Sequence, residues 1–533
     1  MPKAPALRLS GVAIACFLIA IFSIACKPVT DPDFFWHLAS GRYIATFHRI
    51  PTHDVFSLTA QNHRWITHEW LTELLFYGGW LLGGPHLLSL ATGCIITLTF
   101  GLVFRTALER HAPPLLAAPI VLLAALASAH TWGVRPQMLS VLLMALYGLA
   151  IARMLERRLS APPLWVAPTM VLWVNLHGGF IFGLALLSIA TVGYVIEDHW
   201  VAARVRPKLL PLQADTETLA VAVGMGASSR RTAPLPPEDP KRQTSSDIQR
   251  CLLVLALTAL ATLVNPNGLA GALYPISYLG DNASTRYIAE WVSPDFHKPQ
   301  YLLFEGLFLL LLLGAMASPR RAHFLDILVV LPFSYLAFQS VRNINLFAVL
   351  AAPIAAALIA QALPLAWQKR RAPGALSRAK AMLNWICVLV IAAGVTIATA
   401  DNITTKAQAK ALAKSFPTGA LSFITTHGLP ARGFNSYNWG GYLIWNWYPT
   451  RFVFVDGRPD MYGDRFMDRY VHIYSGDPSW QQVFQQNRLC YALVEPNSGI
   501  AGALRTAPGW KRRYQDSVAV LYQTTQPRYG CDP

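Results

Sequence analysis

Charged side chains are scarce in this chain of 533 residues: Asp, Glu, Lys and Arg make up 14% of it, whereas hydrophobic residues make up 54%. Soluble proteins carry nearer a quarter of charged residues, so the composition excludes a soluble enzyme of ordinary type. The mean hydropathy is +0.36, and apolar runs of about 20 residues recur from end to end. These features predict a polytopic helical membrane protein.

Acidic residues are fewer than basic residues, 28 against 44, which gives a formal net charge of +16. Such a charge can indicate nucleic-acid binding. Here, however, the Lys and Arg residues gather at the ends of alternate apolar runs, which is typical of residues that orient membrane helices. We therefore predict the lipid bilayer as a partner and no nucleic acid.

Cysteine is also infrequent, with seven residues, and neither a CxxC pair nor a His/Cys set with the spacing of a zinc site occurs. Five of the cysteines lie in or beside apolar runs. Cys490 and Cys531 are the two that lie in the more polar C-terminal part. If that part faces an oxidising compartment, we expect these two cysteines to form a disulfide.

Eleven apolar runs are expected to cross the membrane as helices. They are residues 9–26, 86–105, 114–131, 137–152, 163–175, 179–197, 251–264, 301–317, 323–339, 344–361 and 382–399. The first run follows a basic start and so also resembles a signal peptide, but its apolar core is long and we predict an uncleaved helix. Residues 70–82 are shorter and rich in aromatics, which is typical of a helix that lies in the membrane interface.

The positions of the cations predict one orientation. If every run crosses the membrane, the basic groups near residues 3–8, 105–110, 153–158, 204–250, 320–321 and 369–380 all lie on the same side. By the positive-inside rule this side is the cytoplasm. We expect a protein of a bacterial-type inner (plasma) membrane, with a cytoplasmic N-terminus and an extracytoplasmic C-terminal domain.

The same pattern predicts two domains. A transmembrane domain would span residues 1–399, with an external loop and interfacial helix at 27–85 and a disordered cytoplasmic linker at 199–249. Residues 400–533 would form a small extracytoplasmic α/β domain. In it, predicted helices at 405–415 and 464–474 alternate with three predicted strands, RFVFVD, CYALVEP from Cys490 and SVAVLYQT around Val518.

The loop at residues 31–70 concentrates ionisable residues beside the first apolar run. Ionisable side chains at the edge of a bilayer are costly and tend to be functional. Asp33 precedes a predicted helix at 34–47 and can instead serve as its N-cap. A proline separates Asp31 from that helix, so we expect Asp31 to be the catalytic base. His37 lies one turn beyond Asp33 and can orient either carboxylate.

Other candidate site residues come from several parts of the chain. They are His68 and Glu69 in the same loop, Asn175 and His177 where a short apolar run breaks, and Glu290 beside Trp291. For the break at residues 175–179, an ordinary glycine-capped helix end is the alternative. Arg135 and Arg342 are rare cations at the external ends of apolar runs, and we expect each to pair with a carboxylate or a ligand phosphate.

Two motifs in this arrangement resemble the GT-C superfamily of integral-membrane glycosyltransferases, which use polyprenyl-phosphate-linked sugars. DPDFFWH at 31–37 resembles the acidic motif in the first external loop of that superfamily, whose aspartate acts as base or metal ligand. NSYNWGGYLIWNWYPTRFVFVDGRPDMYG at 435–463 resembles the tryptophan–aspartate–tyrosine–glycine segment of oligosaccharyltransferase catalytic subunits. Here that segment reads WGGY at 439–442, so the aspartate is absent, which argues against recognition of a glycosylation sequon.

The resemblance implies a GT-C-like membrane domain and a hexosyl-type transferase whose acceptor is a glycan, a lipid or a protein. Asp31 or Asp33 would be catalytic, and Arg342 or Arg135 would bind the phosphate of the polyprenyl lipid. Asp31, Asp33 and Glu290 could together hold a Mg²⁺ or Mn²⁺ ion. Because a single carboxylate cluster stands out, we expect one inverting displacement.

Three residues of the second motif are candidates for acceptor recognition: Trp439, Tyr442 and Asp456. The aromatic residues can alternatively pack in a protein core or form a surface that binds a partner protein. A non-catalytic sensor or assembly protein is therefore one alternative function. A transporter is another, because broken helices with polar residues occur in transporters, but no internal repeat is visible and the number of runs is odd.

Overall fold

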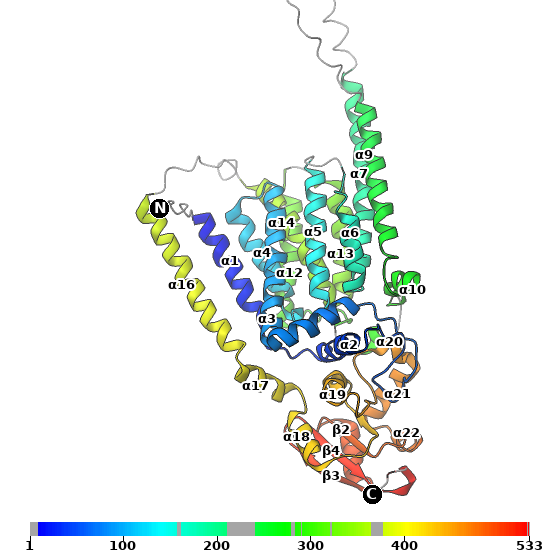
Figure 1. Cartoon of the computed structure of the whole chain (residues 1–533). Coiled ribbons are helices and arrows are strands. Elements are labelled where there is room, and N and C mark those ends of the chain that lie inside the picture. The colour runs from blue at the N-terminus through cyan, green and yellow to red at the C-terminus, as the bar shows by residue number, and fades with distance from the viewer. Residues whose placement is uncertain are drawn as a thin grey trace, which may run out of the picture.

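The computed structural model describes residues 9–156, 161–209, 240–278, 283–288, 290–319, 322–363, 377–529 and 531. A bundle of roughly parallel and antiparallel helices fills one half of the molecule, and a small mixed α/β part lies beyond one end of it (Figure 1). We call residues 31–69 the first loop and residues 405–531 the tail. Both lie at this same end of the bundle, opposite the N-terminus.

The bundle consists of long apolar helices. They are α1 (Leu9–Ala25), α3 (Trp70–Glu109), α4 (Pro114–Ser128), α5 (Gln137–Leu155), α6 (Val166–Leu176), α7 (Phe180–Leu209), α9 (Pro240–Ala261), α12 (Leu302–Ala317), α13 (Phe324–Gln339), α14 (Ile344–Ala362) and α16 (Arg378–Asn402). In an apolar stretch of 18 residues within Val341–Ala362, 94% of the residues are buried, so α14 forms the centre of the bundle. The window Ala379–Ala400 in α16 is 6% buried, so α16 lies at the edge, against α1.

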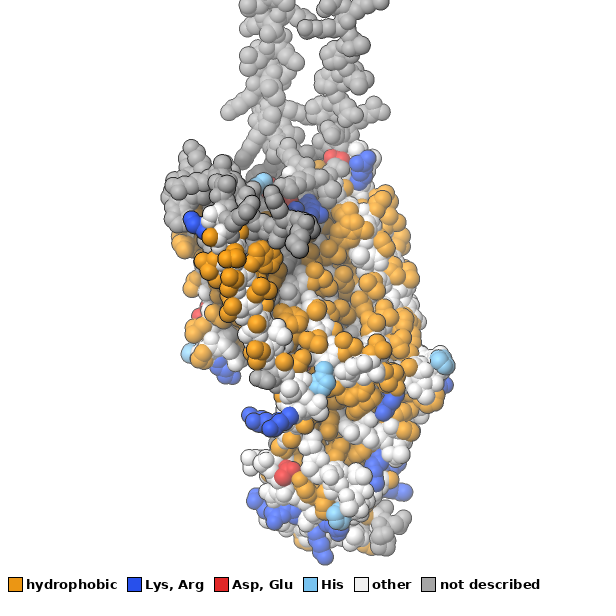
Figure 2. Space-filling model, turned by 60° about the vertical axis from the view of Figure 1, so that its left-hand side comes forward, with side chains coloured by type: hydrophobic (Ala, Val, Ile, Leu, Met, Phe, Trp, Pro, Cys, Tyr) orange, Lys and Arg blue, Asp and Glu red, His pale blue; other side chains and the backbone are white. Residues whose placement is uncertain are grey.

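The prediction of an integral membrane protein is confirmed. Among the described residues, six helical stretches are long and apolar enough to cross a membrane, and four shorter apolar helices accompany them. Hydrophobic side chains cover the visible flank of the bundle, whereas the tail shows more polar and basic side chains (Figure 2). The predicted number of eleven crossings is not established by these helices.

The predicted bounds of the linker were wrong, whereas a helix at 70–82 occurs as predicted. The predicted linker begins and ends inside helices, because α7 continues to Leu209 and α9 already begins at Pro240. Residues 210–239 of that linker lie outside the described part of the chain. The predicted helix at 70–82 is the first section of α3, which lies across the end of the bundle (Figure 1). It is separated from the rest of α3 by Gly84, with φ +60°, and by Pro85, which cannot donate a helical hydrogen bond.

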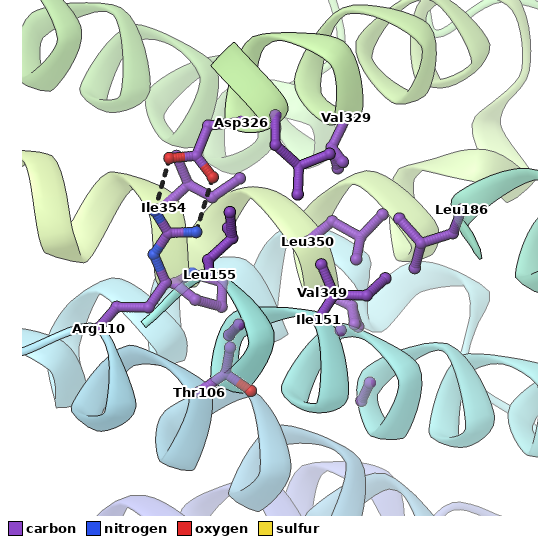
Figure 3. A pocket seen from close by; sticks show the side chains of 15 residues that line it. Thr106, Arg110, Ile151, Leu155, Leu186, Asp326, Val329, Val349, Leu350 and Ile354 are labelled. Atoms are coloured by element: carbon purple, nitrogen blue, oxygen red, sulfur yellow. Dashed lines mark hydrogen bonds and ion pairs between the residues drawn. The ribbon is translucent and has the colours of Figure 1, made fainter. Parts of the chain in front are cut away.

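A buried ion pair joins α3 to α13 at the end of the bundle opposite the first loop. Arg110 donates two hydrogen bonds to the carboxylate of Asp326, at 2.6 and 2.5 Å. The two side chains are 8% and 5% exposed. They form one side of a small cavity whose remaining walls are mostly aliphatic (Figure 3). Two buried charges that satisfy each other can hold two helices in register inside an apolar bundle.

Shorter elements connect the bundle to the tail. The α-helices are α2 (Phe34–Phe47), α10 (Gly268–Leu273) and α11 (Ala283–Tyr287). The 3₁₀ turns of the chain are η1 (Ala129–Thr131), η2 (Tyr274–Tyr278), η3 (Pro299–Tyr301), η4 (Val341–Asn343), η5 (Tyr437–Trp439) and η6 (Pro527–Tyr529). The predicted helix at 34–47 is confirmed as α2, and ten of its side chains are buried.

The tail contains a four-stranded sheet with helices around it. Its elements are α17 (Thr405–Ser415), α18 (Thr418–His427), β1 (Gly433–Asn435), α19 (Gly440–Trp447), α20 (Pro459–Tyr462), α21 (Asp464–Tyr474), α22 (Trp480–Gln486), β2 (Tyr491–Val494), α23 (Gly499–Thr506), β3 (Trp510–Gln515) and β4 (Val520–Thr524). The strand order is β1-β2-β4-β3, with β1 parallel to β2 and the other two pairs antiparallel.

Several predictions for the tail are confirmed. Helices α17 and α21 have the predicted bounds, two of the three predicted strands occur as β2 and β4, and Cys490 and Cys531 form a disulfide. The predicted strand RFVFVD was wrong. In this segment, Val453 forms an isolated bridge with Ser57 of the first loop and no strand of the sheet. The segment therefore pairs with the first loop. Its apolar residues Val453, Phe454 and Val455 are buried in the hydrophobic core that the first loop and the tail share.

The first loop and the tail share one hydrophobic core. Phe34, Phe56 and Trp65 of the loop region pack in the same cluster as Phe434 and Val455 of the tail. All five are at most 4% exposed. Burial on this scale stabilises each aromatic side chain by roughly 2 kcal/mol or more. The loop that follows the first helix is thus fixed by residues about 400 positions later in the sequence.

This arrangement predicts which side of the membrane each end faces. Gln61 in the first loop and Asn497 in the tail are both exposed, and both lie at the end of the bundle opposite the basic residues near Arg105. We expect cysteines at Gln61 and Asn497 to react with a membrane-impermeant thiol reagent in intact cells. A cysteine at the exposed position Arg105 is the control and should react only after permeabilisation. Reaction of Gln61 and Asn497 only after permeabilisation would reverse the orientation.

Candidate active site

The sequence Asp31-Pro32-Asp33 forms a turn that leads into α2. Asp31 Oδ1 accepts a hydrogen bond of 2.9 Å from the backbone N–H of Asp33. Asp33 itself has helical dihedral angles, and its side chain accepts no bond from the first turn of α2. The prediction that Asp33 caps α2 was therefore wrong, since the turn-stabilising oxygen belongs to Asp31. The expectation that Asp31 has no structural role was wrong as well.

Arg135 lies between two carboxylates from distant parts of the chain. Its Nε donates to Asp31 Oδ2, and its Nη1 donates to Glu290 Oε1. Burial acts to raise the pKa of Glu290, but the charge of Arg135 outweighs it and lowers that pKa. The expectation that Arg135 pairs with an anionic group is confirmed for carboxylates. Its guanidinium fixes the first loop to the end of the bundle.

The carboxylate of Asp33 is held much less firmly. The indole Nε1–H of Trp36 donates to Asp33 Oδ1 at 3.3 Å. Burial, and after it the charge of Asp31, raise the pKa of Asp33 to about 7. Arg135 and His37 oppose this rise in part, and Glu290 adds to it. A carboxylate with a pKa near neutrality can accept a proton from a substrate and release it again.

The predicted metal ligands do not fit a shared cation in this arrangement. A guanidinium group occupies the space between Asp31 and Glu290, and the remaining oxygen of Asp31 accepts the turn hydrogen bond. No group of three or more His, Cys, Asp or Glu side chains within the described ranges is arranged to hold a metal ion. The divalent cation therefore gains no support from these residues, and no step below uses one.

A second cluster lies beside α2 and is centred on Glu69. Its carboxylate oxygens lie 3.5 Å from His37 Nε2, 3.6 Å from His68 Nε2 and 3.4 Å from His177 Nε2. The other ring nitrogen of His37 lies 3.3 Å from Glu73 Oε1. His37 therefore faces these glutamates, and its expected orientation toward Asp31 or Asp33 was wrong.

The charges in this cluster shift one another. Burial acts to raise the pKa of the Glu69 carboxyl, but the three histidines outweigh it and hold that pKa well below its usual value. Burial acts to lower the pKa of His37 and of His68, but the charge of Glu69 outweighs it and raises both. The cluster is thus most favourable when Glu69 is ionised and these two histidines are protonated.

The break between α6 and α7 joins this cluster. His177 Nδ1 lies 2.7 Å from Ser140 Oγ on α5. Ser140 therefore holds the imidazole through Nδ1, while Nε2 faces Glu69. Asn175 Oδ1 accepts a hydrogen bond of 2.8 Å from the indole of Trp70. The structure therefore brings Asn175 and His177 together with His37, His68 and Glu69, although they are over 100 residues apart in sequence.

Arg342 lies next to Glu290 at the same end of the bundle. Its backbone N–H donates to the carbonyl of Glu290 at 3.1 Å, and its guanidinium carbon lies 4.5 Å from the centre of the Trp291 ring. The side chain is partly exposed. The charge of Arg342 also helps to lower the pKa of Glu290, so the guanidinium acts on the same carboxylate that Arg135 holds.

Of the three candidate acceptor residues of the second motif, Trp439 and Asp456 are buried and Tyr442 is partly buried. Trp439 is 2% exposed and Asp456 is fully buried, and Tyr442 packs against Phe35 and Phe416. The aromatic stretch forms the helix α19 and no strand. Direct contact of Trp439 or Asp456 with an acceptor does not fit this burial, and the alternative of packed core aromatics does.

Sequence reasoning missed the buried Arg458. It donates two hydrogen bonds of 2.7 Å to Asp456 and lies 2.9 Å from Asp54 of the first loop. Its guanidinium also lies 4.5 Å from the centre of the Trp65 ring. The signal was present in the sequence as an arginine two residues after the aspartate of RFVFVD, but the partner Asp54 cannot be identified without the fold.

The Glu69 cluster predicts a pH-dependent contribution to stability. Its favourable ion pairs need an ionised Glu69, usual pKa 4.5, and protonated histidines, usual pKa 6.5. The contribution is therefore complete between about pH 4.5 and 6.5 and is lost as the pH rises through the raised pKa values of His37 and His68. Glu69→Gln should lower the free energy of unfolding by roughly 3 kcal/mol at pH 6, and by clearly less at pH 8.5.

Thermal unfolding in detergent at both pH values measures this difference. Glu156→Gln is the matched control, because Glu156 faces the exposed His111 at 3.1 Å, and exposed pairs contribute about 1 kcal/mol at most. An equal loss at pH 6 and pH 8.5 for Glu69→Gln would show that its role is packing and not charge.

No protein-family model matches the sequence, and no curated protein matches it. The fold does match solved structures. The apo form of the oligosaccharyltransferase from Archaeoglobus fulgidus has a TM-score of 0.51 at 12% identity, over 96% of this chain and 74% of that one. ArnT from Cupriavidus metallidurans bound to undecaprenyl phosphate has a TM-score of 0.47 at 13% identity, over 98% of both chains.

A third similar structure is the arabinofuranosyltransferase AftD from Mycobacteria, with a TM-score of 0.45 at 15% identity, over 98% of this chain and 40% of that one. Identities this low show a likeness of fold alone. The likeness in fold therefore rests on the archaeal oligosaccharyltransferase, whose TM-score is above 0.5, and it agrees with the resemblance that the two sequence motifs suggested.

Proposed function

We propose that this protein is a membrane glycosyltransferase that moves a sugar from a polyprenyl-phosphate-linked donor to an acceptor on the extracytoplasmic side. The observation that carries the proposal is the position of Asp33: its carboxylate lies at the start of α2, where the first loop meets the tail, and accepts a hydrogen bond from Trp36, and burial raises its pKa. The fold shared with an oligosaccharyltransferase supports the same reaction class, but fold alone does not determine chemistry.

Asp33 is the general base in this mechanism. As the acceptor oxygen attacks the anomeric carbon, Asp33 takes the proton from the acceptor hydroxyl. The bond between the anomeric carbon and the phosphate oxygen breaks, and the electron pair leaves with the polyprenyl phosphate. We assign the base to Asp33, contrary to the expectation for Asp31, because both oxygens of Asp31 already accept hydrogen bonds.

The other charged residues have supporting roles. Arg135 holds Asp31 and Glu290, which fixes the turn that carries Asp33. We propose that Arg342 stabilises the leaving phosphate, whose oxygens gain charge as the bond breaks. One carboxylate remains for the reaction itself, so a single displacement with inversion at the anomeric carbon follows.

In this proposal the tail does not recognise a glycosylation sequon. Its WGGY segment lacks the aspartate of the related motif, and Trp439 is buried. The acceptor is a glycan, a lipid or a protein whose hydroxyl reaches Asp33 from the space outside the membrane. The domains at 1–399 and 400–533 then cooperate at one site, since the first loop is packed on the tail.

Asp33→Asn tests this function, because it keeps the volume of the side chain and removes the charge. The purified protein in nanodiscs is given a panel of undecaprenyl-phosphate-linked sugars with envelope membranes as acceptor source, and release of undecaprenyl phosphate is measured. We expect the variant to lose at least about 100-fold in rate. The wild-type rate should fall as the pH drops through about 7, because Asp33 becomes protonated.

The control is Asp295→Asn, since Asp295 is an exposed aspartate of another external loop and should leave the rate unchanged. Binding of undecaprenyl phosphate should be the same in wild type and Asp33→Asn. A folded Asp33→Asn protein with the wild-type rate would refute the assignment of the base.

A further inference from the structure

Two adjacent glycines of the tail lie in close contact with the turn that carries Asp33. A Cβ atom added at Gly441 would lie 2.6 Å from the carbonyl oxygen of Pro32 and 3.1 Å from the backbone nitrogen of Trp36. A Cβ atom at Gly440 would overlap the backbone of residues 455 and 456 on the other side. The start of α19 therefore packs between the turn and the end of the RFVFVD segment. Gly440 and Gly441 approach the neighbouring backbone so closely that a side chain at either position would overlap it.

A third glycine lies against the carboxylate itself. A Cβ atom added at Gly457 would overlap Asp33 Oδ1 and would lie 3.1 Å from Trp36 Nε1. These two atoms are the acceptor and the donor of the hydrogen bond described above. Gly457 is not among the glycines with positive φ, so its backbone could hold other residues. Space for the Asp33–Trp36 pair is what requires glycine here.

The backbone at Gly457 cannot easily move away from Asp33. The residue on either side of it belongs to the buried ion pair of Asp456 and Arg458, which also reaches Asp54. Just before this pair, the side-chain amide of Asn435 makes three hydrogen bonds to the backbone of the segment. It accepts from Phe454 N at 2.7 Å and from Val455 N at 3.4 Å, and it donates to Val455 O at 2.8 Å. The strip of backbone that faces Asp33 is therefore rigid.

We infer that Trp36 and Gly457 are positioning residues for Asp33: the Trp36 indole directs the carboxylate, and Gly457 leaves the space in which it lies. This inference rests on the proposed function and extends it, because it gives the second sequence motif a role. The tail completes the catalytic turn from outside the membrane, and its glycines serve the base instead of an acceptor peptide.

Trp36→Phe tests the first half of the inference, because it keeps an aromatic ring and removes the N–H donor. A hydrogen bond to a carboxylate favours its charged form, so its loss should raise the pKa of Asp33 further. The charged groups that face Asp33, namely Asp31, Arg135, His37 and Glu290, are unchanged in this variant. We expect the acid limb of the pH–rate profile to move to higher pH, with much of the rate regained at the alkaline plateau.

Gly457→Ala tests the second half. The added methyl group displaces the carboxylate, and a displacement of about 1 Å can cost roughly 100-fold in rate. We expect such a loss at every pH, with undecaprenyl phosphate binding and the unfolding midpoint close to wild type. Gly502→Ala is the matched control in the same tail, because the nearest atom to an added Cβ there is 3.9 Å away, and its rate should be unchanged.

The outcomes separate this inference from the proposed function. If Asp33→Asn is inactive while Trp36→Phe keeps the wild-type pH profile and Gly457→Ala keeps the rate, the base stands and the positioning role is refuted. If Asp33→Asn is active, the proposed function fails first. If Gly457→Ala loses stability together with its rate, the pH profile of Trp36→Phe decides: an unshifted acid limb refutes the inference, and a shifted one supports it.

Discussion

The site at the membrane surface depends on one buried guanidinium. Arg458 is 2% exposed and is shared by Asp54 of the first loop and Asp456 of the tail. Removing one partner of a buried ion pair costs about 3–5 kcal/mol, so loop and tail are expected to fold as one unit. This ion pair holds the first loop against the tail. It therefore helps to position the turn that carries Asp33, the start of α19 and the backbone of Gly457.

Asp31 and Asp33 are close in sequence but have different electrostatic environments. Arg135 keeps Asp31 in an ion pair, and the negative charge of Asp31 in turn raises the pKa of Asp33. In the proposed mechanism, Asp31 thus holds the turn and Asp33 accepts the proton. The division explains why two acids separated by a single proline are present at the site, since neither could fill both roles.

Local features were predictable from the sequence and distant pairings were not. Helix α2 and helix α17 have the predicted bounds because local signals act within a few residues, such as the Thr404 side chain that caps α17. The disulfide was expected because Cys490 and Cys531 are the two cysteines in the polar C-terminal part of the sequence. In contrast, the sequence did not show that Asp31, and not Asp33, stabilises the turn before α2, because the Arg135 that holds Asp31 is over 100 residues away. The RFVFVD segment is no strand of the sheet for the same reason: its partner is the first loop, on the far side of the transmembrane region in sequence.

The central claim is that Asp33 and Arg342 act on one polyprenyl-phosphate-linked sugar at the end of the bundle that carries the tail. An experimental structure of the protein in nanodiscs with undecaprenyl phosphate tests it most directly. The account predicts density for the phosphate group at the end of the bundle that carries the tail, in contact with Arg342 and beside Asp33. Density for the phosphate at the opposite end, for instance near Arg110 and Asp326, would contradict it.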